Sequence, residues 1–240
     1  MSSLISRLRD NNRLSITIIL ALSCLLSVSL QFFRMYYSGF YTYLFLNWNL
    51  FLAILPYVIS TLFLLYYRKI NSLFFTAIIL MAWLLIFPNA PYIVTDFFHL
   101  EPRANVPYWF DLGLIFSFAW NGLILGFISL YDIQTALTRR FSAVKGWAFA
   151  IFSLVLGSFG IYLGRFERFN SWDVLTNPVA LFVDIANRFI HPMQHPRTML
   201  MTMLFSAVLI LGYVTLVVMF KPGRVDSKGN LETHLFKKEN

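Results

Sequence analysis

Charged side chains are scarce in this 240-residue chain, and their scarcity excludes a water-soluble globule. Asp, Glu, Lys and Arg make up 12% of the residues, whereas apolar residues make up 58% and the mean hydropathy is +0.67. A soluble domain carries about 25% charged and roughly 45–50% apolar residues, which lets polar surface cover its core. The composition therefore predicts an integral membrane protein.

Cysteine is almost absent, and several sequence signatures are missing. Cys24 is the only cysteine, so no disulfide can form within the chain. We find no nucleotide-binding loop, nucleophile elbow, zinc-protease motif or haem attachment sequence. We also find no internal repeat of the kind that many transporters carry. Because there is no basic domain, we expect no nucleic-acid partner.

Long apolar stretches are present, and six of them reach the roughly 20 residues that a membrane-spanning helix needs. They cover residues 14–33, 43–67, 72–94, 108–131, 147–164 and 198–220. The predicted fold is all-α: a six-span membrane domain over 14–220 with one or two short interfacial helices on the outer face. Residues 1–13 are expected to form a cytoplasmic segment, and 221–240 a basic, disordered cytoplasmic tail.

The distribution of basic residues predicts the orientation of the spans. Of the 19 Lys and Arg residues, only six fall on the side expected to be outside: Arg34, Arg103, Arg165, Arg168, Arg188 and Arg197. Because basic residues concentrate on the cytoplasmic side, both termini are predicted to be cytoplasmic. The same excess predicts contact with anionic membrane lipids.

Polar residues within the spans gather on the predicted outer half, while the inner half offers little beyond Ser and Thr. The outer set is Asn47, Asn49, Asn89, Asp111, Asn121 and Arg165. An unpaired amide in hydrocarbon is costly, so these groups should face one another or a wet cavity. The alternative is that they join helices through hydrogen bonds, each contributing about 0.6 kcal/mol.

The segment Phe87-Pro88-Asn89-Ala90-Pro91-Tyr92 predicts a break in the third span. Each proline removes a helix donor, and a broken backbone at membrane depth is tolerated only where protein covers it or water reaches it. Asn89 is expected to cap a second helix that runs to Glu101. On that helix Asn89, Tyr92, Asp96 and His99 would form one polar stripe, which predicts the wall of a cavity open to the outside.

The interval 165–197 predicts a second outer helix. Gly157, Gly160 and Gly164 before it allow close helix approach. Asn177 is expected to cap a helix over 178–191, with Pro178 at its first position. Its polar residues form one narrow stripe, namely Asp184, Asn187, Arg188 and His191. Such a pattern is typical of an amphipathic helix in the membrane interface.

Two groups of outer residues could carry chemistry without a metal. Asp96 and His99 are candidate catalytic residues, acting as an oriented general base. Arg165 and Arg168 could grip a phosphate. Further candidate substrate-binding residues lie in the same motifs: Asn49, Asn89, Tyr92, Asn170 and Asp173. The alternative is that Glu167, Asp173 and the arginines form structural ion pairs.

A metal site is the weaker hypothesis. His99, His191 and His195 are the candidate ligands, and His191 and His195 have a metal-like spacing of four residues. Pro192 interrupts the helix that would align these two, so the pattern favours polar turn residues. No cofactor is predicted, and a divalent metal stays open as the alternative.

Three motifs resemble one bacterial family of multi-pass membrane proteins, known only as a domain of unknown function, number thirteen sixty-one. The motifs are Trp48-Asn49-Leu50, the run from Phe87 through Ile93 to Asp96 and His99, and Gly164-Arg165-Phe166 followed by Asn170-Ser171-Trp172-Asp173. The resemblance implies a bacterial cytoplasmic-membrane protein. It implies no activity, substrate or catalytic residue.

Three functional hypotheses follow. The first is an outer-leaflet enzyme or binding protein for an anionic lipid or a lipid-linked glycan. The second is a small transporter or permease subunit, which requires a cavity that also reaches the inner leaflet. The third is a non-catalytic assembly partner of other membrane proteins, whose outer charges contact another chain.

Overall fold

The computed structural model describes residues 13–66, 72–103, 105–169 and 173–220, together with Leu8 and the short segments 224–225 and 231–232. Most of the predicted tail, and the N-terminal segment apart from Leu8 and Arg13, lies outside the described residues. The long helices are α2 (Arg13–Ser38), α3 (Phe45–Tyr66), α4 (Leu73–Ile86), α6 (Tyr108–Arg140), α7 (Ala143–Phe166) and α10 (Pro196–Phe220). The shorter elements are α5 (Asn89–Tyr92), η2 (Ile93–His99), α8 (Asp173–Thr176), α9 (Pro178–Ile190), η3 (Pro192–Gln194), β1 (Arg224–Val225) and β2 (Leu231–Glu232).

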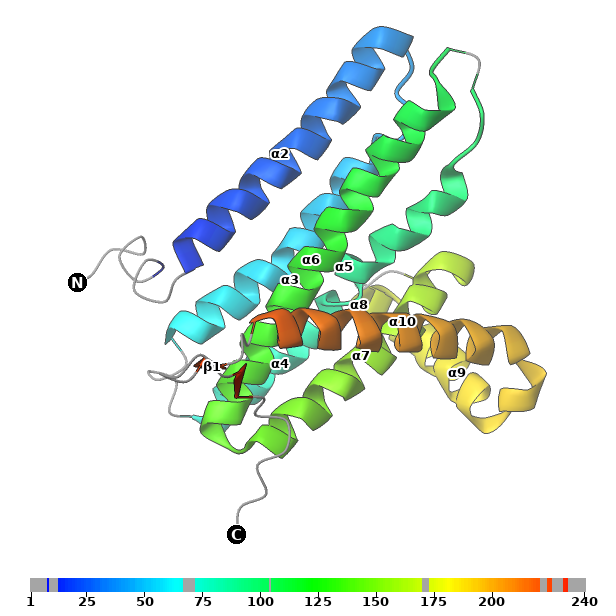
Figure 1. Ribbon diagram of the computed structural model, residues 1–240. Helices are drawn as coiled ribbons and strands as arrows, with labels where there is room; N and C mark the ends of the chain where they lie inside the picture. Colours follow the sequence, from blue (N-terminus) through cyan, green and yellow to red (C-terminus); the bar gives the residue numbers. More distant parts are fainter. Residues whose placement is uncertain are drawn as a thin grey trace.

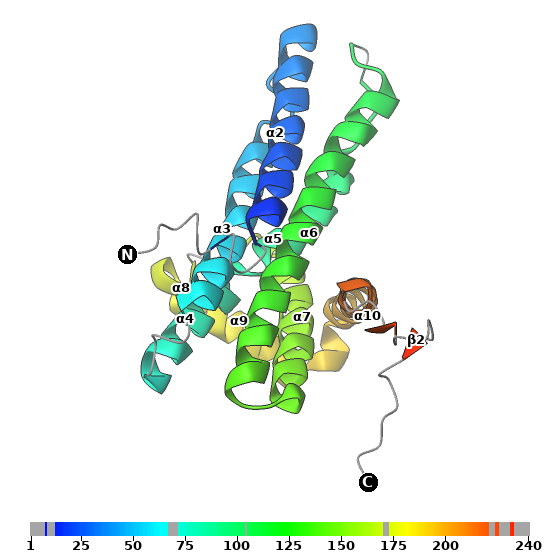
Figure 2. The same cartoon turned by 60° about the vertical axis from the view of Figure 1, so that its left-hand side comes forward.

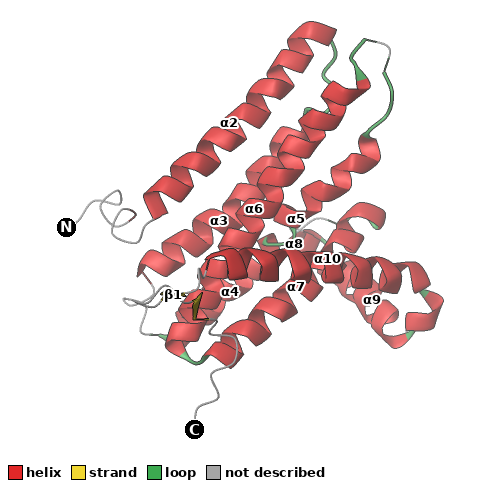
Figure 3. Ribbon diagram, viewed as in Figure 1, coloured by secondary structure: helices red, strands yellow, loops and turns green. Residues whose placement is uncertain are grey.

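Six helical stretches are long and apolar enough to cross a membrane, which confirms the predicted number of spans. They are Arg13–Ser38, Phe45–Tyr66, Leu73–His99, Tyr108–Arg140, Ala143–Phe166 and Pro196–Met219. Figure 3 shows that helix dominates the described part of the chain. The protein is therefore a multi-pass membrane protein of the all-α class.

The helix α6 is the centre of the bundle. It packs along α3 and α2 on one side and along α7 on the other, and the turn at Ser142 makes α6 and α7 a hairpin (Figure 1). The helix α10 packs on α7 but lies across it, so that Figure 2 shows α10 almost end-on while α2 and α6 run along the page. We call the end of the bundle where α2 stops and α6 begins the Gly39 end, and the opposite end the Ser142 end.

The predicted break in the third span is inserted between α6 and α7, and we call residues 87–92 the wedge. Five glycines face it: Gly122 and Gly126 on α6, and Gly157, Gly160 and Gly164 on α7. A Cβ atom at Gly122 would lie 2.5 Å from the backbone oxygen of Ala90. Small residues let backbones approach closely, so these glycines fix the depth of the wedge.

The structure of the wedge differs from the prediction in its helix cap and in the length of the helix that follows. Pro88 is the first residue outside α5, and the side chain of Asn89 does not cap that helix. Instead the backbone N–H of Ala90 donates to Phe87 O, which leaves Ile86 O free, and Asn89 Nδ2 donates to it at 2.8 Å. The predicted single helix to Glu101 is α5 followed by the tighter η2, which ends at His99.

Charged residues are buried at the Ser142 end, although the predicted inner half was expected to carry little beyond Ser and Thr. The helix α6 continues to Arg140, past the end of its apolar stretch, so Asp132 lies inside the bundle with no exposed surface. Asp132 forms an ion pair with Arg13 and accepts hydrogen bonds from Ser60 and Thr61. Asp132 lies just beyond the predicted apolar stretch, and it is buried because α6 continues past the end of that stretch.

The helix α9, predicted as an amphipathic helix in the membrane interface, is tied to the bundle by two residues of its polar stripe, Asp184 and Arg188. Arg188 is buried, with ion pairs to Glu167 and Asp184 at 2.8 Å and a hydrogen bond to Thr198 Oγ1 at 2.9 Å. The bond to Asp184 and the two carboxylates raise the pKa of Arg188 above its usual range. Asn177 forms no side-chain cap. Asn187 is exposed. Arg188 with Asp184 therefore anchors α9, and apolar side chains cover much of the outward face of this helix.

Candidate functional site

Asp96 is the buried centre of the candidate site. Its carboxylate is 1% exposed, and Oδ2 accepts a hydrogen bond from Asn49 Nδ2 at 2.8 Å. Oδ1 has no hydrogen-bond partner within the described part of the chain, and Arg165 Nη1 lies 3.7 Å from it. A buried carboxylate oxygen without a donor is unusual in a folded protein, because burial without a hydrogen bond is costly.

Arg165 joins Asp96 to His99. Its Nη1 also donates to His99 Nε2 at 3.0 Å, and its guanidinium lies 5.3 Å from the centre of the Phe98 ring. A guanidinium can only donate, so Nε2 is the acceptor and a neutral His99 carries its proton on Nδ1. We call Asn49, Asp96, His99 and Arg165 the Arg165 cluster.

The backbone explains why Asp96 and His99 reach the same arginine. The helix η2 has about three residues per turn, so the two residues, three apart, point to one side. Tyr43 Oη donates to the backbone oxygen of His99 at 3.1 Å, which fixes the end of η2. Arg165 is one residue from the end of α7. Next to it Gly164 has no side chain, and the Tyr92 ring packs there.

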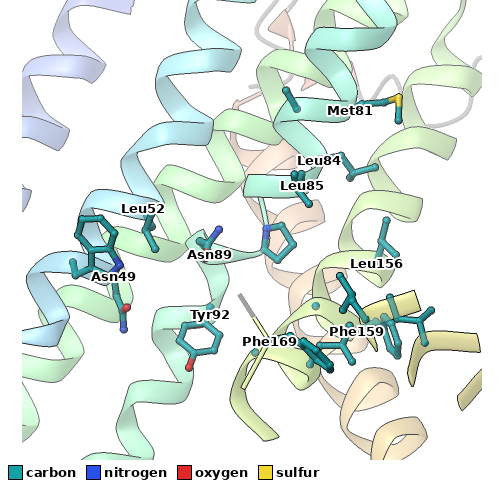
Figure 4. A pocket seen from close by; sticks show the side chains of 18 residues that line it. Asn49, Leu52, Met81, Leu84, Leu85, Asn89, Tyr92, Leu156, Phe159 and Phe169 are labelled. Carbon is teal, nitrogen blue, oxygen red and sulfur yellow. The ribbon is translucent and has the colours of Figure 1, made fainter. Parts of the chain in front are cut away.

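An apolar cavity of about 590 Å³ adjoins the Arg165 cluster. It lies between α3 and α4 on one side and α7 and α9 on the other, and we call it the lateral cavity (Figure 4). Its wall is mostly Leu, Ile, Phe, Pro and Gly, with polar atoms from Asn49, Asn89 and Tyr92. Asn49 belongs to both the cavity and the cluster, so the two share a boundary.

The predicted site residues separate into those that the fold brings together and those that it does not. Asn49, Asp96, His99 and Arg165 form the cluster, and Asn89 and Tyr92 line the cavity beside it. The helix α7 ends at Phe166, and Arg168 is exposed with a φ of 60°. Its spacing of three from Arg165 therefore does not place both arginines on one helix face.

The remaining predicted residues lie elsewhere. Asp173 begins α8, where it accepts a hydrogen bond from Thr176, and Asn170 lies outside the described residues. No hydrogen bond between Asp96 and His99 is present in the described chain, because Arg165 lies between them. The predicted direct pair is thus a pair linked through an arginine.

The candidate metal ligands do not form a group. Among the described residues no three His, Cys, Asp or Glu side chains gather closely enough to hold a metal ion. His99 contacts Arg165, His191 is exposed at the end of α9, and His195 follows η3. These three histidines therefore share no metal site.

Sequence reasoning predicted a cavity wall with Asn89 and Tyr92 but missed the apolar lining of the lateral cavity and the ion pair of Arg34 with Asp111. Arg34 donates to both oxygens of Asp111, at 2.6 and 2.9 Å, and both side chains are buried near the Gly39 end. Both residues had been noted as polar, but nothing in the sequence joined them across 77 positions. The cavity is formed by apolar side chains such as Leu156 and Phe159, which look the same in a sequence whether they face lipid or a hollow.

The cluster has the parts for binding an anion and moving a proton. Arg165 supplies donors in a fixed fork. His99 supplies a ring nitrogen with a lone pair that can accept a proton. Asp96 supplies a carboxylate that holds the arginine, and the exposed His99 marks the side from which a polar ligand can approach.

Comparison with known proteins identifies the family. A family described as Protein of unknown function (DUF1361) matches residues 48–211. The matched part begins in α3 and ends in α10, and it contains the whole Arg165 cluster and the residues that line the lateral cavity. No curated protein and no solved structure matches the chain.

Proposed function

The chain belongs to the DUF1361 family, and we propose that it is an outer-leaflet enzyme or binding protein for an anionic lipid or a lipid-linked glycan. The observation that carries the proposal is the contact of Arg165 with Asp96 and His99 at the edge of an apolar cavity. A cationic group beside a hydrocarbon-like hollow at membrane depth matches a ligand that has an anionic head and an apolar tail.

Arg165 is farther from its carboxylate than the three buried arginines Arg13, Arg34 and Arg188 are from theirs. Arg34 is bidentate on Asp111, Arg13 is in close contact with Asp132, and Arg188 contacts two carboxylates. Arg165 has one carboxylate at 3.7 Å, beyond hydrogen-bond distance. Its side chain is 12% exposed, so a ligand can reach the guanidinium, whose donors can then grip a phosphate.

Binding of such a ligand would also release a base. In the free protein the lone pair of His99 Nε2 accepts from Arg165. A phosphate oxygen that takes over the Arg165 donor leaves Nε2 free to accept a proton from water or a hydroxyl group. Asp96 then keeps the guanidinium in place. This arrangement suits hydrolysis or group transfer on a phospholipid or lipid-linked sugar.

The proposed location is the bacterial cytoplasmic membrane, with the Gly39 end and the Arg165 cluster toward the outside. The asymmetry of Lys and Arg supports this orientation. A fusion of alkaline phosphatase to the C-terminus should be inactive, because that enzyme folds only outside, and a fusion at Arg103 should be active. The reverse pattern would place the cluster on the cytoplasmic side.

Headgroup binding can be measured by thermal unfolding. Cys24 is buried, so a thiol-reactive fluorogenic dye reports unfolding of purified protein in detergent. Phosphatidic acid at about 100 times its dissociation constant stabilises by about 2.7 kcal/mol, which raises the midpoint by about 5–10 °C. Phosphatidylcholine should give no comparable shift.

Two arginine variants separate the cluster from general charge effects. Arg165→Gln should abolish the shift given by phosphatidic acid. Arg197→Gln removes one positive charge from an exposed position after η3 and should keep it. Equal shifts in both variants would refute headgroup binding at Arg165.

The enzyme hypothesis has its own test. Cells that lack the protein are complemented with wild type, Asp96→Asn or His99→Ala, and their lipid extracts are compared by mass spectrometry. Both variants should fail to restore the wild-type lipid pattern although the protein still inserts and unfolds at a normal temperature. If both restore it fully, the protein is a binder and has no chemistry at this site.

A transporter is the second candidate, and the pair of Arg13 and Asp132 favours it. Charged residues inside membrane spans often mark ion or substrate paths. The pair is buried at the Ser142 end, opposite the Arg165 cluster. Asp132→Asn should then impair function while leaving binding of phosphatidic acid intact. If Asp132→Asn with Arg13→Gln complements fully, the pair is structural.

A further inference from the structure

We infer that the lateral cavity holds one hydrocarbon chain of the lipid whose anionic head binds at Arg165. This inference rests on the proposed function and adds the class of ligand: a lipid bound by its head and by a single chain. The second chain of a two-chain lipid stays in the bilayer.

The chemistry of the wall points to a hydrocarbon occupant. Leu84, Leu156 and Phe159 line the cavity at the level of the membrane-spanning helices, and their side chains are labelled around it in Figure 4. An apolar hollow of this size in contact with lipid gains dispersion contacts when it is filled by an apolar group. Water would find few partners there, because only a few polar side chains reach the wall.

The volume of the cavity limits the occupant to one chain. A methylene group is close in size to a water molecule, whose share of liquid volume is about 30 Å³. The 590 Å³ of the cavity therefore has room for roughly twenty such groups. One acyl chain of ordinary membrane length fits this space, and the two chains of a phospholipid do not.

The cavity opens sideways toward lipid. Met81 on α4 and Trp48 on α3 line it and are 72% and 53% exposed on the apolar surface of the bundle. A chain can therefore enter from the bilayer without crossing water. On the other side Leu181 and Ile185 of α9 close the wall.

The position of the cavity relative to Arg165 fits a single molecule. Asn49 lines the cavity and donates to Asp96, which faces Arg165 at 3.7 Å. Gly164 also lines the cavity and is the chain neighbour of Arg165. Arg165 itself does not line the cavity, so the head of a lipid whose chain fills the cavity would extend past this boundary to reach the guanidinium.

The test uses a photoreactive lysophosphatidic acid with a C18 chain that carries a diazirine, in nanodiscs of phosphatidylcholine. After illumination, labelled peptides are mapped by mass spectrometry. Labelling of 156–163 and 181–185 should saturate with probe and should be displaced by unlabelled lysophosphatidic acid. Labelling of lipid-facing positions on α10 such as Leu211 should rise linearly. If cavity labelling is also linear and is not displaced, the inference is wrong.

A matched pair of variants tests the cavity itself. Ala82 lines it, whereas Ala21 is exposed on α2 away from it. Ala82→Phe should lower the saturable labelling about tenfold, and Ala21→Phe should leave it unchanged. Ile185→Phe fills the cavity from the opposite wall and should lower the labelling in the same way. If one of the two variants unfolds at a lower temperature in the Cys24 assay, the other one provides the test. Wild-type labelling in both filled variants would overturn the inference.

The chain site and the headgroup site can fail separately. A monoacylglycerol of the same chain has no phosphate and should compete about tenfold more weakly than lysophosphatidic acid, if Arg165 contributes one charge-assisted hydrogen bond. Equal competition, together with unchanged labelling in Arg165→Gln, would keep the chain in the cavity and reject the anionic head. If saturable labelling is lost but phosphatidic acid still gives its thermal shift, the anionic head binds at Arg165 and the chain does not occupy the cavity.

Discussion

A methyl group at Gly122 should destabilise the protein by about 2 kcal/mol, because it pushes the wedge away from α6. The new Cβ would lie 2.5 Å from Ala90 O and 3.0 Å from Ile93 Cδ1. Ala90 O belongs to the backbone of the wedge and cannot rotate away, and overpacking of this kind costs about 1–3 kcal/mol. Alanine regains about 1 kcal/mol of helix propensity over glycine, so the upper end of the overpacking range leaves a net loss of about 2 kcal/mol.

Gly113→Ala is the matched control on the same helix. A Cβ at Gly113 meets nothing within 4 Å, so only the propensity gain of at most about 1 kcal/mol remains. The same substitution should therefore have opposite signs at two positions of α6. At about 2–4 °C per kcal/mol for a chain of this size, the midpoints should fall by about 4–8 °C for Gly122→Ala and rise by up to about 4 °C for Gly113→Ala.

The thiol-dye assay at Cys24 measures both variants in the same detergent. The wedge also leads into η2, so Gly122→Ala should weaken the thermal shift given by phosphatidic acid, and Gly113→Ala should not. Equal midpoints for the two variants would refute the tight insertion of the wedge. A lower midpoint for Gly122→Ala with an unchanged lipid shift would show that the wedge contributes to stability without positioning the Arg165 cluster.

Three further predictions concern buried polar contacts. Arg34→Met should cost about 3–5 kcal/mol because it leaves Asp111 buried without its partner. Adding Asp111→Leu should restore most of that loss in the same unfolding assay, whereas equal losses would mean that the charge of Asp111 is not the cause. Arg188→Gln removes charge-assisted bonds of about 1.5–3 kcal/mol, so amide hydrogen exchange over 179–190 should quicken about tenfold to a hundredfold, with no change in α2 as the internal reference. Asn89→Ala leaves Ile86 O without its donor and should lower the midpoint by about 2–4 °C; an unchanged midpoint would show that water or another group replaces the bond.

The spans were predictable because the bilayer sets both length and composition. A stretch of about 20 apolar residues is rarely anything else. Five of the six predicted stretches correspond to one helix each, and the third is divided into α4, α5 and η2. Their ends were less predictable, because polar residues can continue a helix when the bundle gives them partners. Asp132 illustrates this: it lies beyond the apolar stretch, yet it is buried against Arg13.

The polar stripe of the Arg165 cluster was predictable for a partly accidental reason. The prediction assumed an α-helix through Asp96 and His99, and the structure has η2 there. A spacing of three keeps two residues on one side in either helix type. The same spacing misled at Arg168, because α7 ends at Phe166 and the chain turns through a positive φ. Spacing is informative only while the helix continues.

The sequence left two hypotheses open for the outer arginines, namely structural ion pairs and an anion-binding site. The distances from each arginine to its carboxylate differ between the two kinds. Arg34 and Arg188 form hydrogen bonds or ion pairs with carboxylates at 2.6–3.0 Å, and these pairs hold α2 to α6 and α9 to the end of α7. Those are structural pairs. Arg165 stands apart, because its carboxylate is 3.7 Å away, one oxygen of that carboxylate lacks a donor among the described residues, and a hollow opens beside it. A buried pair kept for stability alone would close that distance, since a loose pair bears the desolvation cost without the full attraction. The open geometry at Arg165 agrees with the proposed anionic ligand, which would accept from the guanidinium when bound.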